Sequence, residues 1–254
     1  RRKQIPDAML AFRHFLDGLS PEKAAKCRFV LHTEVSTNHG TDLLKINEFL
    51  FGETYPEAII FSTSKLPRKS LNFLYNIADV QILLTSNEGW GLTITEAMLA
   101  GTPFIANVTG GMQDQMRFVD ENGEWFTPSP EIPSNHRGTY KEHGEWVFPV
   151  FPTSRSIQGS PPTPYIFDDR CRWEDATVAI KEVYDLPREE RKRRGLSGRE
   201  WCLSEEAGFT AKYQGQRVME AFTDLWDVWE PREKYEIVNA TEYKGKFLNH
   251  KIIY

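Results

Sequence analysis

The chain has 254 residues, with 40% apolar and 26% charged content, which suits a globular protein of one large domain or two small ones. Its net charge of -5 argues against a strong electrostatic hold on nucleic acid, because domains that bind phosphate backbones are usually basic. The three cysteines are far apart without metal-ligand spacing, and no apolar run approaches the roughly 18 residues that span a bilayer, so we expect a cytoplasmic protein.

Strand and helix patterns alternate in the first part of the chain. The first helix is predicted behind Pro6, where apolar residues recur at helical spacing. Strands are then expected at Cys27–His32, Ala58–Phe61, Val80–Leu84 and Pro103–Ala106, and helices at residues 41–50, 67–78 and 92–100. Such alternation implies an α/β fold, a Rossmann-like parallel sheet with helices on both faces. Ligands of these sheets bind beyond the carboxyl ends of the strands.

The pattern breaks over about residues 128–167, a segment rich in proline. Residues 144–150 suit a short strand within it. A long segment without periodicity is rare inside a compact domain and often has a function. We expect a surface excursion here or, alternatively, a lid or contact surface for an acceptor or a partner.

Helical patterns resume at Arg172, and Asp168 and Asp169 are expected to cap that helix. The same pair could instead hold a divalent metal, which is the weaker interpretation. A strongly charged helix begins at Pro187 and indicates a solvated face, and residues 210–230 suit a last amphipathic helix.

We therefore predict one Rossmann-like domain over residues 1–230, with an insertion at about 128–167, and a tail over residues 231–254. The tail has no clear assignment and would pack against another domain. The chain opens with Arg1-Arg2-Lys3 and not with Met, which favours a piece of a longer protein.

Two carboxylates, Glu88 and Glu96, flank a turn that contains Gly89 and Gly91. The turn separates the third predicted strand from the helix that follows it. A helix that opens on such a turn directs free backbone N–H groups at one point, which attracts an anion such as a phosphate. A carboxylate on each side can hold sugar hydroxyls, so the run indicates a nucleotide-sugar site.

Further motifs surround the two carboxylates. They are Glu88-Gly89-Trp90-Gly91-Leu92, Glu96-Ala97-Met98, Ala100-Gly101-Thr102-Pro103 and Gly110-Gly111. The run resembles the carboxyl-terminal domain of GT-B glycosyltransferases of the retaining family 4 type. Those enzymes carry Glu-Gly-Phe-Gly-Leu, a second Glu eight positions after the first, Ala-Met-Ala-x-Gly-x-Pro and a Gly-Gly loop. The resemblance covers about residues 3–127 and 166–226.

The resemblance implies how the diphosphate of a nucleotide-sugar donor would be held. Lys3 precedes an Ala-Phe pair in the first helix, as the family lysine does, and would place positive charge on the leaving nucleotide. The family's arginine would fall before residue 1, where Arg1 or Arg2 could substitute. Backbone N–H groups at the helix start would meet the same phosphates, those of Gly91, Leu92 and Thr93.

The remaining family positions surround the sugar and the nucleoside. Glu88 would orient the donor sugar and, with Lys3, is the candidate catalytic residue. Glu96 would accept hydrogen bonds from the ribose, and the backbone of Leu66 would touch the base. The other donor-binding candidates are Gly89, Trp90, Gly110 and Gly111.

The sequence therefore predicts the donor-binding, carboxyl-terminal half of a retaining glycosyltransferase that uses a nucleotide-diphosphate sugar. Protein cations and the helix dipole would stabilise the leaving diphosphate, so the resemblance implies no metal site and no cofactor. The acceptor is open and is a glycan, a lipid, a protein or a modified nucleic-acid base. The other half of a GT-B enzyme, which supplies the acceptor site, should lie outside this chain.

Other functions stay open. The chain could be a non-catalytic nucleotide-sugar-binding module or an assembly subunit, although the intact Glu88, Gly91 and Glu96 argue against it. It could also be a nucleotide-sugar epimerase or a phosphorylase of GT-B architecture. Epimerases lack the Glu-Gly-aromatic-Gly-Leu pattern, and phosphorylases need a pyridoxal-phosphate lysine context that this sequence does not show.

Overall fold

The structure is a computed structural model that describes residues 2–38, 40–126, 140, 142–160 and 163–231. The chain divides into two compact units, Arg1–Thr210 and Ala211–Tyr254. The described part of the second unit is essentially one helix, α8 (Ala211–Val228), whose apolar side chains are exposed. Most of the tail predicted at 231–254 lies outside the described residues.

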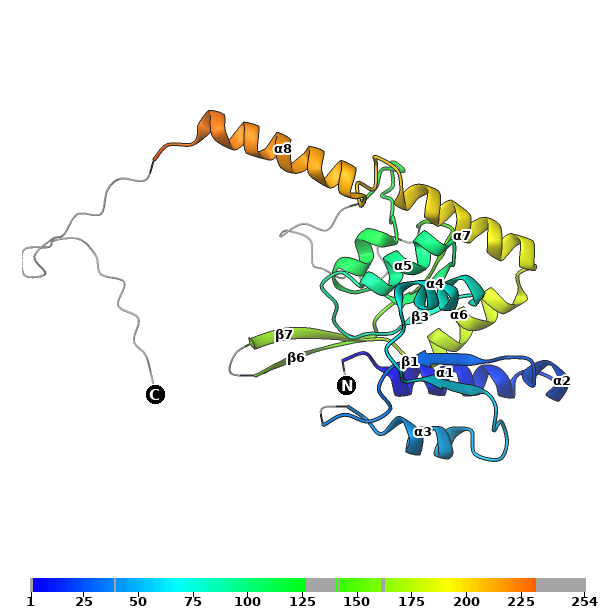
Figure 1. The fold of residues 1–254 in the computed structure, drawn as a ribbon. Helices are drawn as coiled ribbons and strands as arrows, with labels where there is room; N and C mark the ends of the chain where they lie inside the picture. Colours follow the sequence, from blue (N-terminus) through cyan, green and yellow to red (C-terminus); the bar gives the residue numbers. More distant parts are fainter. Residues whose placement is uncertain (1, 39, 127–139, 141, 161–162, 232–254) are drawn as a thin grey trace, which may run out of the picture. The chain divides into compact units, whose positions relative to one another are not determined.

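The elements predicted for the first unit follow one another in the expected order, and the structure adds α2, η1 and the strands β6 and β7 (Figure 1). In chain order they are α1 (Ile5–Asp17), α2 (Pro21–Ala24), β1 (Phe29–His32), α3 (Leu43–Leu50), β2 (Ile59–Ser62), α4 (Arg68–Ile77), β3 (Gln81–Leu83), α5 (Leu92–Ala100), β4 (Phe104–Asn107), the 3₁₀ helix η1 (Gly110–Gln115), β5 (Val147–Val150), β6 (Ser154–Ser160), β7 (Thr163–Arg170), α6 (Trp173–Asp185) and α7 (Arg188–Cys202).

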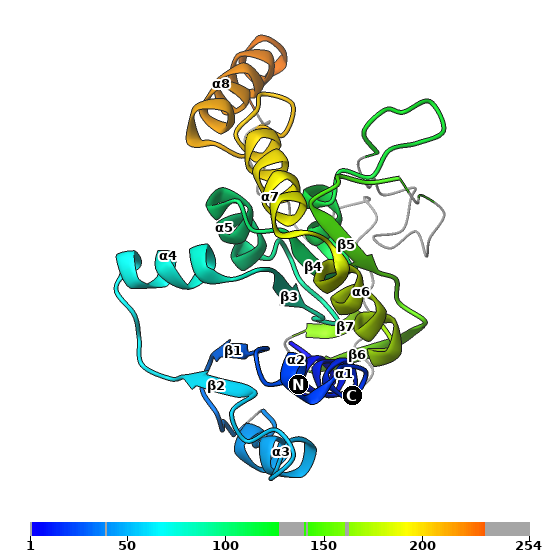
Figure 2. The same cartoon turned by 90° about the vertical axis from the view of Figure 1, so that its right-hand side faces the viewer.

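The described strands pair in three groups. β1 and β2 are parallel, and β3, β4 and β5 are parallel in that order, with Ile105 of β4 between Ile82 and Phe148. β6 and β7 form an antiparallel hairpin. The predicted α/β fold with parallel strands is confirmed, and its parallel strands fall into two sheets (Figure 2).

Helices cover both faces of the β3–β4–β5 sheet. Successive side chains of a strand point to opposite faces, so neighbouring residues of β4 pack against different helices. Ile105 of β4 packs in a buried cluster with Ile180 of α6, together with residues of α1. Its neighbour Phe104 packs in a second buried cluster with Met98 of α5 and Trp201 of α7. The sheet therefore has helices on each side, as predicted.

Strand β5 lies within the proline-rich segment. The short strand expected at residues 144–150 is confirmed, and Val147–Val150 pairs with all four residues of β4. This part of the segment thus completes the parallel sheet, since its apolar side chains belong to both buried clusters. Residues 127–139, 141 and 161–162 of the segment lie outside the described residues.

The expected cap of helix α6 is wrong. Asp168 and Asp169 lie in strand β7, and the residue before α6 is Arg172, which makes no side-chain capping bond. Asp169 points inward instead, where it pairs with Arg155 of β6.

Helix α7 lies unusually close to its neighbours because two of its residues are glycines. A Cβ atom on Gly195 would lie 1.9 Å from the carbonyl oxygen of Gly101, and one on Gly198 would lie 2.6 Å from Cγ of Trp146. No side chain fits at either position. Within the described ranges, every helix is too short or too polar to be a membrane-spanning segment.

Candidate functional site

The candidate site begins where strand β3 ends and helix α5 starts. Gly91 precedes the helix with φ of +86°, a left-handed conformation that glycine adopts without strain. The first N–H groups of α5, beginning at Leu92 and Thr93, have no acceptor within the helix, so they face out at this end. Leu92 itself is 71% exposed, so this end of the helix is open to solvent.

Two cations converge on Glu88 in the turn before the helix. Nη1 of Arg2 lies 2.9 Å from Oε2 of Glu88, and Nζ of Lys3 donates to the same oxygen. The Glu88 side chain is only 15% exposed. Burial by itself would raise the pKa of Glu88, but the hydrogen bonds and charges of Lys3 and Arg2 outweigh it and hold the pKa below its ordinary value. Glu88 is therefore a carboxylate at neutral pH.

Backbone contacts fix the segment that carries the two cations. The carbonyl oxygen of Arg2 accepts hydrogen bonds from the backbone N–H of Ser86 at 2.9 Å and from Oγ1 of Thr85 at 3.2 Å. Gln4 then turns the chain into α1 with φ of +50°, which is uncommon for a residue other than glycine. These contacts place Lys3 beside Glu88, although the two are far apart in sequence. Arg1 lies outside the described residues, whereas Arg2 lies beside Glu88.

The Gly-Gly loop closes on the same turn. A Cβ atom on Gly110 would lie 2.0 Å from the carbonyl oxygen of Glu88, and one on Gly111 would lie 2.1 Å from that of Gly89. The N–H of Gly111 donates to the carbonyl oxygen of Glu88 at 3.2 Å. Backbone packs directly on backbone here, so both positions need glycine.

Glu96 lies on helix α5 and is exposed. Its Oε2 accepts a hydrogen bond of 2.6 Å from the hydroxyl of Tyr75 on α4. Burial, followed by this bond and the charge of Glu96, raises the pKa of Tyr75, so its hydroxyl stays a donor. Tyr75 thus orients Glu96 and leaves the other carboxylate oxygen for a ligand.

Trp90 is turned into the protein. Its Nε1 donates to Oγ1 of Thr95 at 2.9 Å, and that hydroxyl donates to Oε1 of Gln115 at 2.7 Å. Its ring meets the edge of Phe209 with the centroids 4.9 Å apart. The Trp90 side chain therefore anchors the turn within the protein, and its carbonyl oxygen accepts a hydrogen bond from Nε2 of Gln115. Leu66 lies in the loop after β2, at the carboxyl end of the other parallel sheet.

The structure adds residues that no spacing in the sequence indicated. Asn107, Thr109 and Asp169 are buried and, with the partly buried Arg155, form a hydrogen-bonded group next to the turn. Asn107 ends β4, Thr109 follows it, and Arg155 and Asp169 lie in β6 and β7. The sequence gives no signal for contacts between segments so far apart. Among the described residues, no group of three His, Cys, Asp or Glu side chains is placed to hold a metal ion.

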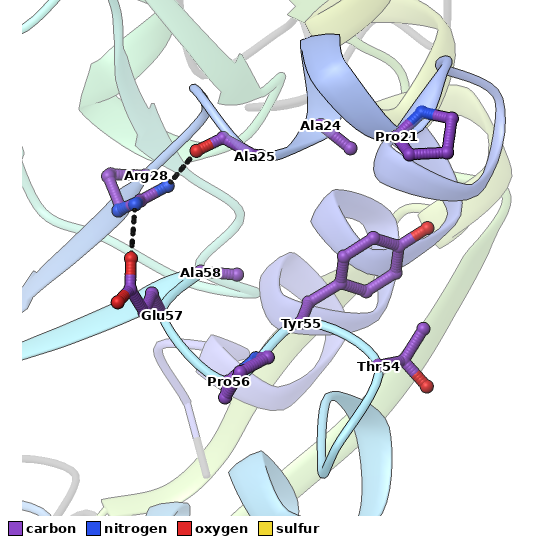
Figure 3. A pocket seen from close by; sticks show the side chains of 9 residues that line it. All are labelled: Pro21, Ala24, Ala25, Arg28, Thr54, Tyr55, Pro56, Glu57 and Ala58. Carbon is purple, nitrogen blue, oxygen red and sulfur yellow. Dashed lines mark hydrogen bonds and ion pairs between the residues drawn. The ribbon is translucent and has the colours of Figure 1, made fainter.

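A hollow of about 270 Å³ lies away from these residues (Figure 3). Its lining comes from α2 and from the residues just before β1 and β2, so it opens at the amino ends of these strands. Arg28 and Glu57 in its wall are paired at 2.8 Å. Because ligands of parallel sheets bind beyond the carboxyl ends, this hollow is not the candidate site.

Comparison with known proteins agrees with the geometry. Residues 54–132 match the family described as "Glycosyl transferases group 1". A trehalose synthase from Pyrococcus horikoshii is 32% identical over 65 residues, which are 26% of this chain and 16% of that protein.

Solved structures resemble nearly the whole chain. Sucrose-phosphate synthase from Thermosynechococcus elongatus has a TM-score of 0.55 at 18% identity, over 90% of this chain and 44% of that one. A structure titled trehalose-6-phosphate from E. coli, bound with UDP-2-fluoro glucose, has a TM-score of 0.53 at 14% identity, over 91% of this chain and 42% of that one. At these identities the likeness shows the fold, and the chain spans less than half of either structure.

The fold and the matched segment define the class: this is an α/β domain of the GT-B glycosyltransferase type. The segment that matches the group 1 glycosyl transferases, residues 54–132, includes Glu88 and Glu96. The family resemblance predicted from the sequence is confirmed.

Proposed function

We propose that this chain supplies the donor site of a retaining glycosyltransferase that transfers a sugar from a nucleotide-diphosphate sugar. The observation that carries the proposal is the meeting of Arg2, Lys3 and Glu88 at the Gly-lined start of α5. Two cations, free helix N–H groups and a carboxylate at one point suit a ligand that has a diphosphate next to a sugar.

Each group has a definite part in the proposed reaction. Lys3, Arg2 and the backbone N–H groups of Gly91, Leu92 and Thr93 stabilise the negative charge that grows on the departing diphosphate. Glu88, ionised and fixed, accepts hydrogen bonds from the sugar hydroxyls. Glu96, oriented by Tyr75, accepts from the ribose, and the backbone of Leu66 meets the base. These roles need no metal ion and no cofactor.

The nucleotide sugar is proposed as the co-substrate because the similar E. coli structure is bound with UDP-2-fluoro glucose. The acceptor, which is a glycan, a lipid, a protein or a modified base, would bind to the other half of a GT-B enzyme, and residues 231–254 would pack against that half. We propose that the enzyme works in the cytoplasm and that the chain alone binds donor but transfers little.

A thermal-shift screen of the chain against UDP, GDP, ADP, CMP and dTDP and their sugars tests the donor site, with and without EDTA. A bound nucleotide stabilises the folded chain by mass action, by about 2.7 kcal/mol at 100 times its Kd. We expect one base to be preferred, with a shift that EDTA does not change. A shift that EDTA abolishes would contradict metal independence.

Glu96→Ala should reduce that shift, because the ribose loses its acceptor, without lowering the melting temperature of the free chain. Tyr75→Phe should reduce it less, since Glu96 remains. If Glu96→Ala binds the nucleotide as the unchanged chain does, the ribose assignment is wrong. If no nucleotide shifts the melting temperature, the proposed donor site fails.

A further inference from the structure

Asp169 of β7 is a buried carboxylate held by several separate segments, and its side chain is only 1% exposed. Its Oδ1 accepts from Nε of Arg155 at 2.7 Å, and its Oδ2 accepts from Oγ1 of Thr109 at 2.8 Å. Its backbone N–H donates to the carbonyl oxygen of Ser86 at 2.8 Å. Its own carbonyl oxygen accepts from Nδ2 of Asn107 at 2.7 Å.

These partners are the roots of the two loops that form the candidate site. Ser86 follows β3 and lies two residues before Glu88, whereas Thr109 follows β4 and directly precedes Gly110. Asp169 thus bonds to the first residues of both loops, at the ends of β3 and β4. Elsewhere the loops meet where the N–H of Gly111 donates to the carbonyl oxygen of Glu88 and where Nε2 of Gln115 donates to that of Trp90. Asn107 also donates to the carbonyl oxygen of Thr85 at 3.0 Å. Asp169 is the buried charged residue among these links and bonds to the base of both loops.

Stability alone is a poor reason for such a group. Removing two charges from water costs free energy, and the attraction within a buried ion pair often does no more than offset that cost. Apolar side chains of equal volume would therefore often give the same stability. A fully hydrogen-bonded buried group does fix geometry, because each of its bonds has a preferred distance and direction. The Asp169 side chain has such bonds to Arg155 and to Thr109.

We propose that Asp169 is a positioning residue of the donor site: through Thr109 and Ser86 it sets the spacing between the Gly110–Gly111 loop and the Glu88 turn. This inference rests on the proposed function. Asp169 itself touches no donor group and acts through the two loops. Because the loops bracket the diphosphate and sugar end of the proposed site, Asp169 governs recognition of that end and not of the nucleoside, which Glu96 and Leu66 would hold.

The test breaks one bond of the group and leaves its shape intact. Thr109→Val replaces the hydroxyl by a methyl group, and Thr109→Ser keeps the hydroxyl. Thr177→Val is the matched control. Thr177 lies on helix α6, and its Oγ1 donates to the carbonyl oxygens of Trp173 at 3.0 Å and Ala11 at 3.2 Å. Asp169→Asn is the second variant, because it keeps the volume and removes the charge.

Calorimetry would compare a nucleoside diphosphate with its nucleoside, using UDP and uridine, or the pair whose diphosphate gives the largest thermal shift. Losing one buried hydrogen bond should weaken diphosphate binding about tenfold in Thr109→Val and at least as much in Asp169→Asn. Nucleoside binding should stay within about twofold, which is below the effect of one hydrogen bond. Thr109→Ser should restore diphosphate binding, and Thr177→Val should leave it unchanged while lowering the melting temperature.

Two results would overturn the inference while the proposed function stands. One is that folded Thr109→Val and Asp169→Asn chains bind the diphosphate as the unchanged chain does. The other is that diphosphate and nucleoside binding weaken equally, which would mean a general loss of structure. If the unchanged chain binds no nucleoside diphosphate, the donor site itself is refuted, and this inference falls with it.

Discussion

At the scale of single residues, the candidate site depends on where side chains are absent. Gly110 and Gly111 lie against the carbonyl groups of Glu88 and Gly89 at distances that no Cβ atom tolerates. Around Gly89 itself the space is open, with nothing within 4 Å of an added Cβ. Gly110 and Gly111 are therefore required for close packing of two backbone segments, whereas Gly89 is not.

This difference gives a paired prediction. Gly111→Ala should destabilise the chain by about 1–3 kcal/mol, the range for overpacked positions, because backbone cannot move aside as a side chain can. Gly89→Ala should fold with nearly unchanged stability. Urea unfolding of both variants measures this, and equal stability of the two would show that the Gly-Gly loop can shift freely.

Gly91→Val would be a poor probe of phosphate binding. Gly91 has φ of +86°, and an added Cβ would lie 3.2 Å from Cγ of Met112, so the substitution would strain the fold itself.

The sequence indicated most of the site but not its support. Glu88, Glu96 and the glycines were predicted because they stand in one short run with a local meaning. The inward turn of Trp90 depends on bonds to Thr95 of α5 and Gln115 of η1, and the Asp169 group depends on contacts between segments that are distant in sequence. A pattern of residue types carries no information about such contacts, and Asp169 next to a helix suggested a cap instead.

At the scale of helices and strands, local patterns were sufficient where burial is periodic. The helix after Gly91 and the strand at Val147–Val150 were both expected, since glycine and apolar alternation mark them. The pairing of β5 with β4 was not expected, because the prolines around this strand indicated a surface excursion and not a strand of the main sheet. Among the described strands β5 pairs with β4 alone, so Pro149 lies on an edge strand, where proline is tolerated.

Helix α7 offers a prediction about packing between elements. Gly195→Ala would place a methyl group 1.9 Å from the carbonyl oxygen of Gly101 and force α7 away from α5. We expect a loss of about 1–3 kcal/mol of stability, against the gain of up to about 1 kcal/mol that alanine brings to an exposed helix position. Gly215→Ala on α8, where nothing lies within 4 Å, is the control and should not destabilise the chain. A melting temperature of Gly195→Ala equal to that of the control would contradict the close approach.

At the scale of the whole molecule, acidity should lower stability through His143. Burial lowers the pKa of His143, against the opposing effects of the Gly144 carbonyl and Glu182, so the folded chain holds this ring neutral. The unfolded chain takes up a proton below pH of about 6.5 and the folded chain resists it, so stability falls as pH drops through that value. His143→Gln should flatten this dependence between about pH 7 and 5.5, measured by urea unfolding. A slope equal to that of the unchanged chain would refute the assignment.

The contacts that build the site also bear on the order in which it forms. Arg2 bonds to Ser86 across 84 positions, and Thr109 bonds to Asp169 across 60. Loops of this length close late, because their entropy must be lost before the contacts form. During synthesis the Glu88 turn and the glycines leave the ribosome well before Asp169, the residue that joins them. The signature of this site is local in the sequence, yet its assembly should be among the last events of folding.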